Sequence, residues 1–161
     1  MSVFFYRTFL VFLSIFLVIY LFDFLAIKTV RPDLVLIIVT YIAYRKGSFS
    51  GEITGFFYGL AEDFLFSSLF GIHAFSKFIT GYITGKFVSN FIIDNFFVQF
   101  FIILIVSIIN NVIFLGAALV FTNISFFDYL GLLWIKTLYT AFVGVFLWYF
   151  LVYFERNLGE I

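Results

Sequence analysis

The chain has 161 residues, of which 65% are hydrophobic and only 11% are charged. Soluble domains carry about 45–50% apolar and about 25% charged residues. The composition therefore excludes an ordinary cytosolic domain, a disordered chain and a nucleic-acid binder. The formal net charge is zero, and the absence of cysteine excludes disulfides, thiolate metal sites and thiol catalysis. We expect the lipid bilayer to be the solvent for most of this chain.

Six apolar segments are expected to form transmembrane helices, because a bilayer core of about 30 Å needs roughly 20 apolar residues per helix. The expected spans cover residues 8–27, 32–44, 51–66, 72–91, 96–121 and 129–154. They leave only short connections, so residues 1–161 are expected to form a single transmembrane domain. The fold class is then an all-α integral membrane protein with a six-helix bundle. The second segment is short for a span, which leaves a five-span bundle as the alternative.

The second segment has recognisable start and stop signals. It opens with Arg31-Pro32-Asp33. Proline is favoured at the first helical position, and an aspartate there opposes the positive end of the helix dipole. Two cations followed by Gly47 end the segment, as is typical of a helix C-terminus.

The basic residues favour a cytoplasmic location for both chain termini, since cytoplasmic segments are enriched in Lys and Arg. With six spans, the cytoplasmic segments hold Arg7, Arg45, Lys46, Lys86 and Arg156, and the outer side holds Lys28, Arg31 and Lys77. Near the ends of the last span, Trp134 and Trp148 are expected to lie in interfacial aromatic belts.

Small residues recur at four-residue spacing in the third and fourth segments. The third contains Gly51, Gly55 and Gly59, and the fourth contains Gly81 and Gly85. Small residues at this spacing let two helices approach closely. Simple helix packing is therefore the main interpretation of these glycines.

Asp63 continues the glycine stripe of the third segment, so its side chain is expected to face a partner helix. A hairpin turn near residues 69 and 70 brings Asp63 to a similar depth as Lys77, which predicts an ion pair between them. Arg31 is a rival partner at the same side of the membrane. The other interpretation is that Asp63 contacts a ligand or a partner protein, because charges within spans usually face protein or water.

Asn110 lies in the middle of the fifth segment, beside Ser107 and Asn111. Amides inside a membrane usually bridge helices through hydrogen bonds. A small polar ligand held by Asn110 is the alternative interpretation. The candidates for structural or partner contacts are Arg31, Pro32, Asp33, Gly55, Gly59, Asp63, Gly71, Lys77, Gly81 and Asn110.

No catalytic or metal-binding pattern stands out in the sequence. The chain has one histidine, and its carboxylates do not follow metal-ligand spacing. It has neither a phosphate-binding glycine loop with its lysine nor a Ser-His-Asp arrangement. We therefore expect no enzymatic activity, no metal and no cofactor.

An ordered set of motifs resembles one known family. The motifs are Arg31-Pro32-Asp33, then Gly55-Phe56-Phe57-Tyr58-Gly59-Leu60-Ala61-Glu62-Asp63, then Phe70-Gly71-Ile72-His73-Ala74. In this order they are similar to MreD, the family of rod shape-determining membrane proteins. The motifs lie within residues 31–85, and the later spans match in hydropathy alone. Phe70 stands where the family usually has Leu, and Glu62 adds a second acid beside Asp63.

The resemblance implies a protein of the bacterial cytoplasmic membrane that belongs to the cell-elongation complex. Its relatives act with MreC, the MreB filament, a RodA-like glycosyltransferase and a class B penicillin-binding transpeptidase. The implied fold is similar to the substrate-binding components of energy-coupling-factor vitamin transporters. Two functions follow as hypotheses: a non-enzymatic scaffold that binds MreC and helps couple MreB filaments to peptidoglycan synthesis, or a small-molecule-binding membrane component of a transporter.

Overall fold

The computed structural model describes residues 30–66, 70–88, 95–121 and 126–158. These residues form five α-helices: α2 (Leu34–Lys46), α3 (Ser48–Phe66), α4 (Ile72–Phe87), α5 (Phe96–Phe121) and α6 (Phe126–Leu158). The first expected span, residues 8–27, lies outside the described residues. All the regular elements among the described residues are therefore α-helices.

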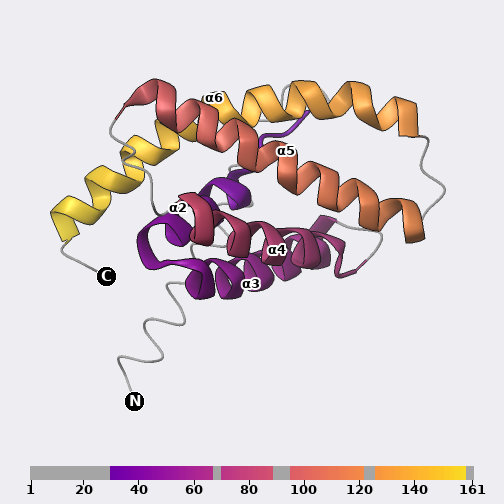
Figure 1. Ribbon diagram of the computed structural model, residues 1–161, viewed down its shortest axis with the longest axis horizontal. Helices are drawn as coiled ribbons and strands as arrows, with labels where there is room; N and C mark the ends of the chain where they lie inside the picture. Colours follow the sequence, from indigo (N-terminus) through magenta and orange to yellow (C-terminus); the bar gives the residue numbers. More distant parts are fainter. Residues whose placement is uncertain (1–29, 67–69, 89–94, 122–125, 159–161) are drawn as a thin grey trace, which may run out of the picture.

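The five helices form two pairs with one helix between them. α3 and α4 lie side by side, α5 and α6 form the second pair, and α2 contacts members of both (Figure 1). Eight of the 13 residues of α2 are buried. This short helix therefore lies in the interior of the described bundle. Its side chains are apolar because they pack against other helices, although the helix is shorter than a full span.

α2 begins and ends two residues later than the expected span 32–44. Pro32 precedes the helix and does not occupy its first position, because Asp33 is the N-cap and Leu34 is the first helical residue. The Asp33 Oδ1 accepts a hydrogen bond from the Leu36 N–H at 2.9 Å, which satisfies one of the unpaired donors of the first turn. At the other end, Gly47 adopts φ +84°, a left-handed conformation that reverses the chain directly into α3.

Two helices in the described part of the chain are long and apolar enough to cross a membrane: Phe96–Phe121 and Gly131–Tyr153. α5 has the bounds expected from the sequence, whereas α4 ends at Phe87, four residues earlier than expected. α6 has 33 residues, which corresponds to about 50 Å of helix. It is longer than a bilayer core of about 30 Å.

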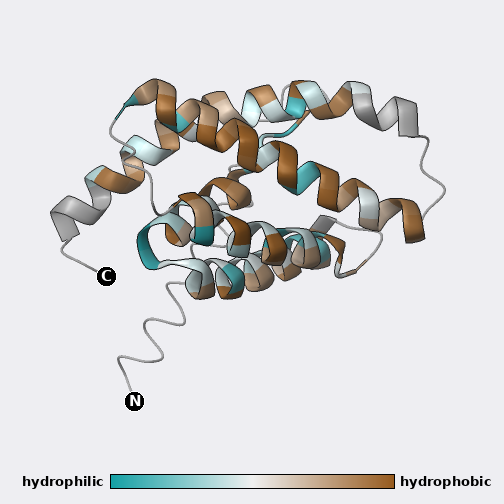
Figure 2. Cartoon of the chain, viewed as in Figure 1, coloured by the Kyte–Doolittle hydropathy of each residue, from teal (hydrophilic) through white to brown (hydrophobic). Residues whose placement is uncertain are grey.

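Polar residues are gathered inside the bundle and large apolar residues outside it. Buried polar side chains include Asp33, Glu62, Asp63, Lys77, Gln99, Asn110 and Asn111. Exposed side chains include Phe64, Val120 and Trp134, and most of α5 is coloured as hydrophobic in Figure 2. Figure 2 shows the junction of α2 and α3 in teal, and the last turn of α2 holds two cations. An apolar exterior around a polar interior is the arrangement expected of a chain dissolved in lipid.

The apolar part of the core joins α2 to α5 and α6. Trp148 of α6 is 2% exposed and packs against Tyr41 at a ring-centroid distance of 5.1 Å and against Tyr44 at 5.5 Å. The expected place of Trp148 in an interfacial belt is therefore wrong, because its face of α6 is turned toward α2. Trp134, which is 63% exposed, remains on the exterior.

Candidate functional site: a buried ion cluster

A fully buried lysine joins α2, α3 and α4. The Nζ of Lys77 lies 3.0 Å from Asp33 Oδ2 and 2.7 Å from Glu62 Oε2. The Lys77 side chain is 0% exposed, and the side chains of Asp33 and Glu62 are 2% and 10% exposed. Burying one of these charges alone would be costly, because a low-dielectric interior solvates an ion poorly. The three groups compensate one another, so the helices that carry them are held in one arrangement. We call Asp33, Glu62, Lys77 and the neighbouring His73 the ion cluster.

The cluster corrects the predicted partner of Asp63. Among the described residues, Lys77 pairs with Asp33 and Glu62, not with Asp63. Asp33 is 44 residues from Lys77 along the chain. Glu62 is adjacent to Asp63, and consecutive helical residues point about 100° apart. The spacing correctly predicted an acidic residue of α3 at the depth of Lys77. That residue is Glu62 and not the expected Asp63.

Asp63 instead caps the beginning of α4. Its Oδ2 accepts hydrogen bonds from the N–H groups of Gly71 at 3.0 Å and Ala74 at 2.9 Å, and its Oδ1 accepts one from His73 at 3.0 Å. The unpaired N–H groups and the positive dipole at a helix N-terminus both favour a carboxylate. Gly71 is the N-cap residue with φ +101° and has no capping side chain. A carboxylate from the preceding helix therefore takes over the role of the cap.

His73 lies at the edge of the ion cluster. Its Nδ1 is 3.9 Å from Glu62 Oε1, which is too long for a hydrogen bond, and its side chain is 17% exposed. The ring stacks on Phe114 of α5 with 4.6 Å between centroids. Within the described part of the chain, Nδ1 is a buried atom without a hydrogen-bond partner.

The cluster extends to α6 through the backbone of Asp33. The Asp33 N–H donates to Thr140 Oγ1 at 3.0 Å. Thr140 is fully buried. One residue at the start of α2 therefore contacts α4 through its side chain and α6 through its main chain.

The glycines form a contact between the backbones of α3 and α4. A Cβ added at Gly51 would lie 2.6 Å from the carbonyl oxygen of Gly81, and one at Gly59 would lie 2.6 Å from the Cα of Ala74. A Cβ at Gly55 would overlap the carbonyl group of Lys77. Such contacts have no room for a methyl group, because the neighbouring atoms belong to main chain. The hairpin of α3 and α4 therefore depends on these glycines.

Polar side chains of α5 bridge to its neighbours. The amide of Asn111 donates to Thr137 Oγ1 of α6 at 2.9 Å. Thr80 Oγ1 of α4 lies 3.5 Å from the Asn110 side-chain oxygen, at the edge of hydrogen-bond distance. Because Thr80 already donates to the Ser76 carbonyl at 2.7 Å, the better orientation for Asn110 turns its NH₂ toward Thr80. Buried amides thus contact the helices on both sides of α5.

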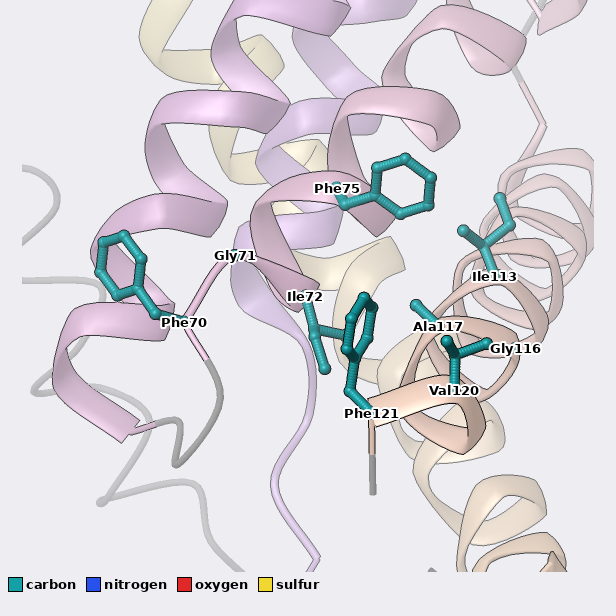
Figure 3. A pocket seen from close by; sticks show the side chains of 9 residues that line it. All are labelled: Phe70, Gly71, Ile72, Phe75, Ile113, Gly116, Ala117, Val120 and Phe121. Atoms are coloured by element: carbon teal, nitrogen blue, oxygen red, sulfur yellow. The ribbon is translucent and has the colours of Figure 1, made fainter. Parts of the chain in front are cut away.

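Two hollows lie between α4 and α5. One has a volume of about 730 Å³ and is bounded by the start of α4 and the C-terminal part of α5, where Figure 3 shows the side chain of Phe75 directed toward Ile113. The other, about 630 Å³, lies between the C-terminal part of α4 and the N-terminal half of α5. Apolar side chains form most of both linings, so these hollows match acyl chains or apolar side chains and not a polar solute.

The residues predicted from the sequence as structural or partner contacts lie in three places: the ion cluster, the hairpin of α3 and α4, and the surface. Asp33 and Lys77 meet in the cluster, Gly55, Gly59 and Gly81 lie at the hairpin contact, and Asp63 and Gly71 form the cap of α4. Pro32 is buried and Arg31 is exposed. Asn110 contacts Thr80.

The sequence did not predict the partners that Asp33 finds in α4 and α6. Thr140 carries no distinguishing signal, because a threonine in an apolar helix usually bonds its own backbone. Glu62 could have been identified only from its burial beside Lys77. That burial depends on how α3 is rotated about its axis relative to α4. Among the described residues, no group of three or more His, Cys, Asp or Glu is arranged to hold a metal ion.

Comparison with known proteins supplies the family of the chain. Residues 1–158 match the family model described as rod shape-determining protein MreD. The match covers the ion cluster, the cap of α4 and the glycine contact as well as the later helices. Neither the curated proteins nor the solved structures gave a match.

Proposed function

Because the chain belongs to the MreD family of rod shape-determining membrane proteins, we propose that it is a non-enzymatic scaffold subunit of the bacterial cell-elongation complex. It lies in the cytoplasmic membrane and binds MreC. Through MreC it helps couple MreB filaments to peptidoglycan synthesis by a RodA-like glycosyltransferase and a class B penicillin-binding transpeptidase. The family match over residues 1–158 is the observation that carries this proposal.

The geometry of the bundle supports a scaffold in two ways. The ion cluster and the glycine contact hold α2, α3 and α4 in a fixed arrangement. The exterior carries large apolar side chains such as Phe57 and Phe146, at 60% exposure each. In a membrane, helices associate through close packing of such preformed surfaces. A rigid bundle with an apolar exterior is suited to binding a transmembrane helix of a partner.

Affinity purification tests the proposal directly. The tagged protein is extracted from membranes with a mild detergent, and co-purifying proteins are identified by mass spectrometry. The expected result is recovery of MreC, with or without the transpeptidase. A matched purification of the Gly55→Leu variant, whose hairpin cannot close, is the control for binding that requires the folded bundle.

The alternative, a small-molecule-binding component of a transporter, predicts a different result. The protein would then be recovered with an energising transporter module, or alone with a small polar molecule bound. Purification without MreC and with such a module would overturn the scaffold proposal. The apolar linings of the two hollows between α4 and α5 do not favour a polar, vitamin-like ligand.

A further inference from the structure

The ion cluster carries more negative than positive charge among the groups in contact. Asp33 and Glu62 supply two carboxylates, and among the described residues Lys77 is the one ammonium in contact with both. Uncompensated charge is expensive in a dry, lipid-embedded interior. Binding a proton is the simplest way to remove one negative charge, because a proton needs no additional space.

The geometry offers one place for this proton. Lys77 approaches Glu62 through Oε2, which leaves Oε1 facing His73 Nδ1 at 3.9 Å. Nδ1 is a buried atom with no hydrogen-bond partner among the described residues. An imidazole nitrogen and a carboxylate oxygen can share a proton in a single hydrogen bond, provided that they approach to about 2.8 Å. The His73 side chain is 17% exposed, so the described residues do not fully enclose the pair.

We propose that Glu62 and His73 form a proton-binding site, in which one exchangeable proton is shared between Glu62 Oε1 and His73 Nδ1. Binding adds a proton to the pair and forms one hydrogen bond between the end of α3 and the start of α4. Loss of the proton removes this hydrogen bond and leaves Asp33 and Glu62 with one more negative charge than Lys77 balances. The proposal does not depend on the identity of any partner protein.

Other charged groups surround the site and are part of its electrostatics. Asp33 precedes α2, Asp63 lies on α3, and Lys77 lies on α4. Lys136 of α6 also acts electrostatically on Asp33, Glu62 and His73. Lys136 is half-buried, so solvent weakens its influence. Asp63 is already compensated by three N–H groups of α4. Asp63 therefore adds little to the excess charge, which is shared by Asp33 and Glu62.

The single histidine of the chain provides a direct test. The full-length protein is labelled with ¹⁵N-histidine, reconstituted in lipid nanodiscs, and the Nδ1 resonance is followed from about pH 4 to about pH 9. We expect one pH-dependent step in the wild-type protein. In Glu62→Gln the carboxylate that attracts the proton is lost. The step is therefore expected at a lower pH, at a proton concentration at least about tenfold higher than in the wild-type protein. The matched control Glu52→Gln removes a carboxylate at the other end of α3 and leaves the step unchanged.

In the labelling experiment, two results would overturn the proposal: no step in the wild-type protein, or the same step in Glu62→Gln. If Glu62→Gln does not fold, His73→Gln supplies an independent measurement. Thermal unfolding of the wild-type protein in nanodiscs is expected to change with pH across the same step. Equal pH dependence in His73→Gln would exclude a shared proton.

Discussion

Lys77 joins α4 to α3 and to the start of α2 in the described bundle. Its ammonium is fully buried and contacts carboxylates from α3 and from the start of α2. A buried ion pair adds little stability compared with apolar residues, but removing one partner leaves an uncompensated charge. The cluster therefore disfavours helix arrangements that would separate these charges, and it adds little to the total free energy of unfolding.

Replacing Lys77 with Met is expected to lower the free energy of unfolding by about 3–5 kcal/mol, because Asp33 and Glu62 lose their counter-ion. Chemical unfolding of the purified protein in detergent measures the effect. The control is Lys86→Met on the exposed part of the same helix, for which a change below about 0.5 kcal/mol is expected. Equal stability of the two variants would show that Lys77 is not a structural counter-ion. Combining Lys77→Met with Asp33→Asn and Glu62→Gln is expected to restore part of the loss.

Asp63→Ala is expected to destabilise the protein by about 2 kcal/mol, the upper end of the range for removal of a helix cap. Three N–H groups of the first turn of α4 lose their acceptor. Hydrogen exchange of the amides of Gly71, His73 and Ala74 locates the effect, and these amides are expected to exchange faster in the variant. Unchanged exchange at all three would contradict the assignment of Asp63 as a cap.

At the scale of elements, α3 and α4 can pack closely because the glycines between them have no side chain. The two main chains approach so closely that a methyl group at Gly51, Gly55 or Gly59 would meet backbone atoms. Elsewhere, Gly116 of α5 has open space around its Cβ position. The same substitution therefore has opposite consequences on the two helices.

Gly55→Ala is expected to destabilise the protein by about 1–3 kcal/mol, because the helices must separate to admit the methyl group. Gly116→Ala is the matched control and is expected to stabilise the protein by up to about 1 kcal/mol, since alanine is the better helix former. Thermal unfolding of both variants in the same detergent gives the comparison. A stabilised Gly55→Ala variant would show that α3 and α4 are not in backbone contact.

At the scale of the whole molecule, the distribution of side chains defines which surface meets lipid. Trp134 is 63% exposed on the exterior of α6, whereas Trp148 is 2% exposed against α2. The chain has only these two tryptophans. Each can therefore report separately on the position of the bundle in the bilayer.

In nanodiscs made with lipids brominated on their acyl chains, the fluorescence of Trp134 is expected to be quenched and that of Trp148 preserved. Bromine quenches only at short range, so an indole shielded by α2 is protected. The variants Trp148→Phe and Trp134→Phe isolate the two signals. Equal quenching of both would contradict the burial of Trp148.

The sequence could predict those features that depend on local pattern. The bounds of α5 follow from one uninterrupted apolar run, and the glycine spacing indicated a close helix pair. It could also predict that Asp63 faces α4, because its position continues the stripe. The sequence could not predict whether Asp63 would meet the side chain of Lys77 or the backbone of α4. That depends on where α4 begins, and a shift of one residue rotates every side chain by about 100°.

The sequence by itself determined the solvent, the helical class and the family of this protein. Composition dictates burial in lipid, and lipid forces the backbone to satisfy its hydrogen bonds within helices. Only the tertiary structure decided that Lys77 pairs with Asp33 and Glu62, that Asp33 reaches Thr140, and that Trp148 belongs to the core. These contacts join residues far apart in the chain. They depend on the rotation and depth of each helix relative to its neighbours, which no single segment encodes.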